Sequence, residues 1–189
     1  MMGMLKGVAT LALVSVVAVS TAQAQGVELG LGGGVSIPTN NNFKDAFKTG
    51  WNGQVSLGWV AQNIPVGFEV DGNFQRNSSK ATGLDIKNQL IYGTGNVVYK
   101  FKTSEASMFH PYIIGGVGAY NAKEKGNDVP AGVGSVTKFG INGGAGFDVV
   151  SKSNVGFFVE GRFHNIFISG ANLNFVNVDA GVRFKLGNH

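Results

Sequence analysis

The sequence predicts an all-β fold, an eight-stranded antiparallel up-and-down transmembrane β-barrel with periplasmic N- and C-termini. Three observations predict it. Eight segments alternate apolar residues with polar residues or glycine, the two-residue period of a β-strand. Charged residues in these segments fall only on the polar face. The connections after strands two, four and six are short, whereas those after strands one, three and five are long, as expected for periplasmic turns and extracellular loops. Lipid is the expected cover of the apolar face, because the chain offers no amphipathic helix that could cover it.

The N-terminal segment 1–24 is interpreted as a signal peptide. Lys6 precedes an apolar run from Val8 to Val19, and Ala22 and Ala24 supply the small side chains that signal peptidase accepts. The run is too short for a membrane-spanning helix, which needs about 20 apolar residues. We therefore expect residues 25–189 to form a single barrel domain.

The composition excludes several classes of protein. The chain contains no cysteine, so it has neither a disulfide framework nor a thiolate metal site. Its net charge is +4, but the lysines are dispersed and no basic cluster alternates with aromatic residues. Nucleic acid is therefore not an expected partner. The 30 Gly, 14 Phe and 14% charged residues suit a β-rich chain with more apolar surface than one small core needs.

The first four strands are expected at 27–37, 51–61, 66–75 and 91–101. In each of them the apolar residues and several glycines take every second position, which we assign to the lipid side. Pro38 ends the first strand, and the polar connection 39–49 has room for one short helical turn. The connection at Pro65 is short, whereas the polar loop from 76 to 85 is long.

The last four strands are expected at 111–120, 138–149, 155–167 and 176–186. The final strand alternates most regularly. The first of the four is the least regular, because Ile113 and Ile114 are both apolar and glycines follow them; there we assign Tyr112, Ile114 and Tyr120 outward. Tyrosines eight residues apart would span roughly 20 Å at about 3.3 Å per residue and a tilt near 40°, close to the separation of two interfacial aromatic girdles.

The expected girdle residues are Trp51, Trp59, Tyr99, Tyr112 and Tyr120.

Ionisable residues on the inward positions are expected to form a charge network in the lumen. They are Glu28, Glu69, Asp71, Lys100, Lys138, Asp148, Glu160, Arg162, His164, Asp179 and Arg183. The interior of an eight-stranded barrel is just wide enough for side chains to fill it, so a salt-bridged plug is expected. The local partner of Arg162 is Glu160, and that of Arg183 is Asp179, with Glu28 or Glu160 as alternatives. The alternative interpretation is a water or ion path along these charges.

Acid–base chemistry is the enzymatic hypothesis to weigh, because Glu160 and His164 flank Arg162 on one inward row. A hydrogen-bonding role inside the lumen is favoured for His164. The sequence contains no metal-ligand cluster, phosphate loop or nucleophile elbow. We therefore expect no enzyme, no catalytic or metal-binding residue and no cofactor.

Three local sequences resemble the OmpA/OmpX-type family of eight-stranded outer-membrane barrels. They are Asn96–Phe101, His110–Tyr120 and Asp179–Leu186. The last is similar to the family's C-terminal assembly signal, here Gly181, Phe184 and Leu186, with Leu186 in place of the usual aromatic residue. The resemblance covers 25–189. It implies insertion by the barrel-assembly machinery into the outer membrane of a Gram-negative-type bacterium, as a monomer surrounded by lipid and lipopolysaccharide.

Two function classes follow. The first is a structural or surface-interaction barrel of the adhesion type, with a filled lumen and loops that contact a surface ligand. The alternative is a narrow passive pore for small solutes or ions.

Overall fold

The computed structural model describes residues 26–60, 64–83, 85–104, 107–129, 134–150, 154–168 and 171–186. The predicted signal peptide 1–24 and residues 187–189 lie outside these ranges, so the signal peptide stays a prediction. Among the described residues, no helix is both long and apolar enough to cross a membrane.

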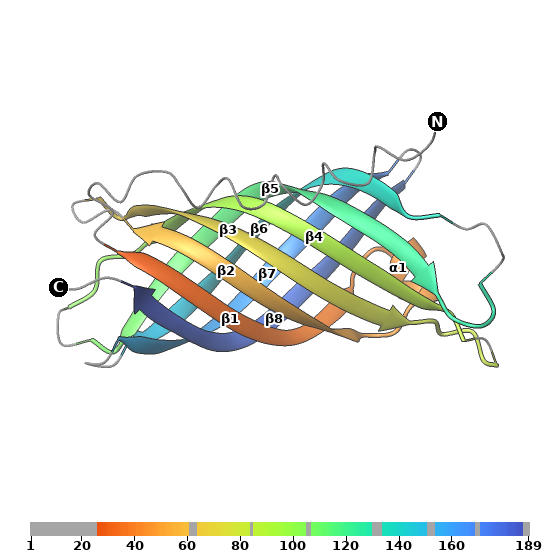
Figure 1. Ribbon diagram of the computed structural model, residues 1–189, viewed down its shortest axis with the longest axis horizontal. Helices are drawn as coiled ribbons and strands as arrows, with labels where there is room; N and C mark the ends of the chain where they lie inside the picture. The colour runs from red at the N-terminus through yellow and green to blue at the C-terminus, as the bar shows by residue number, and fades with distance from the viewer. Residues whose placement is uncertain are drawn as a thin grey trace, which may run out of the picture.

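The eight strands close into one barrel, in which each pairs antiparallel with its sequence neighbours and β8 pairs with β1 (Figure 1). The strands are β1 (Val27–Pro38), β2 (Gly50–Val60), β3 (Val66–Ser78), β4 (Lys87–Lys100), β5 (Phe109–Lys125), β6 (Val136–Val150), β7 (Val155–Ile168) and β8 (Ala171–Leu186). A short helix, α1 (Asn41–Ala46), follows β1. The predicted fold class is confirmed.

Some strands extend beyond the alternating segments. β5 continues to Lys125, and β8 begins at Ala171 rather than near Val176. The extensions remain hydrogen-bonded, as the pairing of Lys87 with Lys125 shows. An apolar outer row is needed only where lipid touches the wall, so the sequence period marks the membrane-facing part of a strand and not its full length.

The two ends of the barrel differ. Val27 pairs with Leu186, so β1 begins where β8 ends; we call this the terminus end, and it also holds connections 61–65, 101–108 and 151–154. The opposite loop end holds connections 39–49, 79–86, 126–135 and 169–170. Short connections were predicted at the terminus end and long ones at the loop end. This holds only in part, because connection 101–108 at the terminus end is as long as connection 79–86 at the loop end. The periplasmic position of the terminus end stays a prediction.

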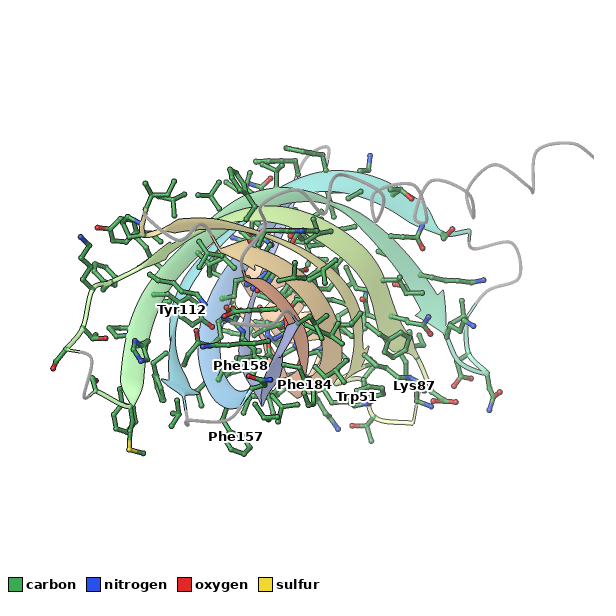
Figure 2. All side chains as sticks on the ribbon, turned by 60° about the vertical axis from the view of Figure 1, so that its left-hand side comes forward. Trp51, Lys87, Tyr112, Phe157, Phe158 and Phe184 are labelled. Carbon is green, nitrogen blue, oxygen red and sulfur yellow. The ribbon has the colours of Figure 1, made fainter. Side chains whose placement is uncertain are left out.

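The outer wall is apolar, and seven strands follow the predicted orientation. Phe157 is 61% exposed on the outside, whereas its neighbour Phe158 is 2% exposed and points into the lumen (Figure 2). Trp51, Trp59 and Tyr99 all take outward positions. Their role in an aromatic girdle stays a prediction.

The predicted orientation of β5 is wrong. Tyr112 and Tyr120 are each 1% exposed and Ile114 is buried, while Ile113 and Val117 lie on the outer wall. Both tyrosines are thereby excluded from the aromatic girdle. The sequence left the choice open, since Ile113 and Ile114 offer an apolar side chain on either face. Interior partners decide it, because each buried phenol reaches a hydrogen-bonding side chain on β7.

Gly181 shows why one residue of the predicted assembly signal is glycine. A Cβ atom there would lie 2.2 Å from the carbonyl oxygen of Leu31 on β1 and 2.6 Å from the ring of Phe158 on β7. Only glycine lets β8 approach β1 this closely beneath that ring. The neighbouring signal residues Phe184 and Leu186 take outward positions.

An arginine on the outer wall should impair folding. Val70 and Val178 are 46% and 42% exposed on the lipid side, and an arginine facing the bilayer midplane costs about 2 to 4 kcal/mol. Val70→Arg or Val178→Arg will therefore lower the folded fraction in vesicles, read as heat-modifiable gel migration. Asn127→Arg, in the exposed connection 126–135, is the matched control and will fold like the wild type. Equal yields for all three variants would contradict the lipid-facing assignment.

Candidate functional site

Arg162 on β7 is the centre of the charge network in the lumen. Its Nη1 lies 2.6 Å from Asp71 Oδ2, and its Nη2 lies 2.7 Å from Glu160 Oε1. The same Nη2 lies 3.2 Å from Glu69 Oε1. Asp71 and Glu69 belong to β3, which does not pair with β7, so these contacts tie opposite parts of the wall together across the lumen. The predicted pairing with Glu160 is confirmed.

Arg183 on β8 does not use any of the partners proposed from the sequence. It contacts Asp148 on β6 at 3.1 Å and Glu69 on β3 at 3.4 Å. Its guanidinium also lies 4.9 Å from the ring centres of Tyr112 and Phe158. The predicted partners were acids on the same strand or on strands that pair with β8. A long side chain in a narrow barrel instead reaches strands that do not pair with its own.

Lys100 extends the network to the terminus end. Its Nζ lies 2.8 Å from Glu28 and 3.3 Å from Asp148, which also contacts Arg183. A cavity of about 230 Å³ opens here, lined in part by these side chains and by His110. Lys138, also predicted for the network, forms no salt bridge with the described residues and lines a separate cavity of about 280 Å³ at the loop end. It lies apart because it enters the barrel near that mouth.

Neutral polar side chains complete the network, and the sequence reasoning missed them. Asp71 accepts hydrogen bonds from Asn73 at 2.5 Å and Thr94 at 2.8 Å. Asn96 donates to Asp71 at 2.7 Å, and Tyr112 donates to Glu160 at 3.0 Å. Buried carboxylates need such donors in addition to a cation. Their inward position was a usable signal for the asparagines and Thr94, but not for Tyr112, whose strand orientation was misassigned.

His164 and Glu160 do not form an acid–base pair. The ring of His164 is buried, its Nδ1 lies 2.9 Å from the Tyr120 hydroxyl, and it stacks on Phe175 at 4.6 Å. Glu160 is instead bonded to Arg162 and Tyr112. His164 is thus the interior hydrogen-bonding partner that we expected. No group of described residues has the His, Cys, Asp and Glu content of a metal cluster.

An aromatic plug closes the lumen at the loop end. We define it as Phe43, Leu90, Tyr92, Tyr120, Ile166 and Phe175, all of them buried. Phe43 is carried by α1, so connection 39–49 folds over the mouth of the barrel. Asn40 fixes this connection to β8, since its amide donates to the Asn172 carbonyl and its Oδ1 accepts from the Asn174 N–H. The helical turn expected in this loop is confirmed, and it completes the plug.

The surface of the loop end is basic. Together with the strand ends beside its connections, its described residues include eight lysines and arginines and four acids: Lys44, Lys48, Arg76, Lys80, Lys87, Lys123, Lys125 and Lys138, with Asp45, Asp85, Glu124 and Asp128. We define Lys44, Lys48 and Lys80 as the basic loop patch; all three are exposed, and a bridge between Phe47 and Ser79 joins their segments. At the same end Lys87 lies 2.5 Å from Asp85, and its hydrogen bond holds the pKa of that carboxyl below its usual value.

A closed barrel with an apolar outer wall and a charged, plugged lumen defines the class of small transmembrane β-barrels. The family model described as the outer membrane protein beta-barrel domain matches residues 9–185, and the chain belongs to this family. The protein is therefore located in the outer membrane of a Gram-negative-type bacterium. The predicted resemblance to eight-stranded outer-membrane barrels is confirmed.

Three solved structures are similar to this chain. Neisserial surface protein A is 20% identical, with a TM-score of 0.65 over 85% of this chain and 97% of that chain. Ail of Yersinia pestis, solved with the heparin analogue sucrose octasulfate, is 18% identical, with a TM-score of 0.54 over 85% of this chain and 99% of that chain. The outer membrane enzyme PagL is 15% identical, with a TM-score of 0.51 over 84% of this chain and 99% of that chain.

These identities establish a shared fold only. One of the three structures is an enzyme, so the fold does not decide catalytic activity. No curated protein matches the sequence.

The partners of Arg183 can be tested by double-mutant cycles. Arg183→Met will destabilise the barrel by about 3 to 5 kcal/mol, because it leaves buried carboxylates without their cation. Combining it with Asp148→Asn or Glu69→Gln will recover part of the loss, a coupling of about 0.5 to 3 kcal/mol. Combining it with Asp179→Asn is the control and will give additive losses. Urea unfolding in detergent micelles measures these energies, and additivity for Asp148 and Glu69 as well would contradict the network.

Proposed function

We propose that the protein is a structural and surface-interaction barrel of the adhesion type that binds its ligand through the loop end. The observation that carries this proposal is the closed lumen. The network around Arg162 crosses the barrel interior, and the aromatic plug fills the mouth above it. A filled interior serves as a rigid support, so the exposed connections are the part of the molecule available for recognition.

The charge of the loop end favours an anionic ligand. Lys44, Lys48 and Lys80 project from two segments that the bridge at Phe47 and Ser79 holds together. Such a patch attracts phosphate or sulfate groups on a glycan, including those of lipopolysaccharide. The complex of Ail with a heparin analogue supports this choice, since it shows that a barrel of this fold can hold a sulfated sugar.

We propose no enzymatic activity. Glu160 and His164, the candidate acid–base residues, are each engaged with other partners in the network and the plug. The protein is further proposed to be a monomer in lipid. In this proposal the barrel-assembly machinery recognises Gly181, Phe184 and Leu186 at its C-terminal strand.

A narrow passive pore is the second candidate function. Some buried polar atoms form no hydrogen bond with the described residues, among them Oδ1 of Asn52 and Oδ1 of Asn177. These atoms favour a pore, because water inside the lumen could bind them. This candidate requires a continuous path past Arg162 and the aromatic plug.

Conductance in planar bilayers separates the two candidates. The wild type will give no steady single-channel current, because the plug and the network close the lumen. Phe43→Ala and Tyr120→Ala in one chain will open the loop end but leave the network, and the current will stay absent or rare. Steady conductance of the wild type, reversed in ion preference by Glu69→Lys, would establish the pore instead.

Binding to a sulfated glycan tests the loop end. Changing Lys44, Lys48 and Lys80 to Gln will weaken binding of a heparin oligosaccharide to the barrel in nanodiscs by roughly 3- to 150-fold, since exposed charge pairs contribute about 0.2 to 1 kcal/mol each. Lys102→Gln, an exposed lysine beyond β4 at the terminus end, is the matched control and will bind like the wild type. Equal affinity for a desulfated oligosaccharide, or no loss in the triple variant, would refute the proposal.

A further inference from the structure

Among the described residues, Asp179 is the one carboxylate within the barrel interior, away from its mouths, that forms no salt bridge; Glu124, also inward, lies at the loop-end mouth. Lys100, Arg162 and Arg183 form ion pairs with the other five, namely Glu28, Glu69, Asp71, Asp148 and Glu160. The two remaining inward lysines, Lys138 and Lys185, lie at the mouths of the barrel. The interior thus carries more negative than positive charge, and Asp179 is 3% exposed. A buried carboxylate in this position needs either a proton or a compensating cation.

Further oxygen atoms near Asp179 also lack partners. Asp179 Oδ1 makes no hydrogen bond to the described residues, and neither do Asn52 Oδ1, Asn177 Oδ1 and Ser36 Oγ. All four side chains are more than nine-tenths buried. Well-packed interiors seldom leave several polar oxygens unsatisfied in one region, so these groups call for a water molecule or an ion as their partner.

The sheet register brings these residues together. Asn52 on β2 and Asp179 on β8 both pair with Gly34 on β1, so the three form one row across adjacent strands. The Asn52 side chain is a hydrogen-bonding neighbour of the Asp179 carboxylate, but Oδ1 of each residue remains without a partner among the described residues. Ser36 pairs with Asn177 two residues further along β1 and β8, on the same face. The oxygens therefore line one stretch of the lumen wall.

Gly34 makes room for the Asp179 carboxylate over β1. A Cβ atom on Gly34 would lie 2.7 Å from Asp179 Oδ1 and 1.9 Å from the Val178 carbonyl oxygen. Any side chain at this position would therefore displace the carboxylate and collide with β8. Because Gly34 has no side chain, the Asp179 carboxylate lies over β1 in the same row as Asn52; we call this part of the lumen wall the niche.

We propose that this niche binds a monovalent alkali cation, of which sodium is the test ion. The ligands are one Asp179 carboxylate oxygen, the side-chain carbonyl oxygens of Asn52 and Asn177, and the Ser36 hydroxyl. Hard cations take carboxylate, amide carbonyl and hydroxyl oxygens. A single carboxylate among neutral oxygens matches one positive charge, whereas calcium sites gather several carboxylates. The cation neutralises Asp179 and ties β1, β2 and β8 together at the place where the barrel closes.

Linkage between binding and folding gives a direct test. Urea unfolding of the barrel in zwitterionic micelles is measured at increasing sodium chloride concentrations. Choline chloride makes up the rest of the salt, so that the ionic strength stays constant. Above the dissociation constant, each tenfold rise in sodium will raise the folded-to-unfolded ratio about tenfold, because one ion binds the folded state. Sodium-23 line broadening by the folded wild type, reversed by excess potassium, will report the bound ion directly.

Variants identify the site. Asp179→Asn will abolish the sodium dependence, and Ser36→Ala will raise the sodium concentration at half-saturation several-fold. Asp45→Asn, at an exposed acid on α1, is the control and will keep the wild-type response. The line-broadening measurement on the wild type remains decisive if Asp179→Asn does not fold.

Three results would overturn the proposal. An equal response to choline would mean that the effect is ionic screening. A wild type without sodium dependence or line broadening would mean that water or a proton, and not a cation, occupies the niche. An unchanged response of a folded Asp179→Asn variant would place the ion elsewhere.

Discussion

Closure of the sheet between β1 and β8 is the constraint on which the rest of the structure depends. Twelve residue pairs join the two strands, from Val27 with Leu186 to Pro38 with Phe175. Lipid offers no hydrogen bonds, so a wall with an open edge would leave backbone groups unsatisfied. Once the wall is closed, every second side chain must enter a space that eight strands make narrow. The outer face can then be uniformly apolar, and all polarity is directed inward.

The narrow interior explains why the charges are shared and not simply paired. Arg162 contacts carboxylates from β3 and from its own strand, and Arg183 contacts carboxylates from β3 and β6. Removing two charges from water is expensive, and each extra hydrogen bond offsets part of that cost. The carboxylate of Glu69, which touches both arginines, joins the two halves of the network. This cross-bracing supports the proposed structural role of the barrel.

Function then depends on what the rigid barrel presents at its ends. Connection 39–49 contributes in two ways, because Phe43 completes the aromatic plug while Lys44 and Lys48 face outward. One short segment thereby both seals the lumen and carries part of the basic loop patch. Sequence identity of 20% or less to the solved barrels, over most of their length, is consistent with a fold that constrains the wall while its loops vary.

The sequence by itself determined the number of strands, the orientation of seven of them and the inward position of every network charge, because a two-residue period assigns side chains to faces. It could not orient β5, where Ile113 and Ile114 satisfy either face and only the partners of Tyr112 and Tyr120 on β7 decide. It also could not name the partners of Arg183 or show that Asp179 forms no salt bridge with the described residues. Those contacts cross the lumen between strands that do not pair, and their reach is set by the register of the closed barrel, which no local pattern contains.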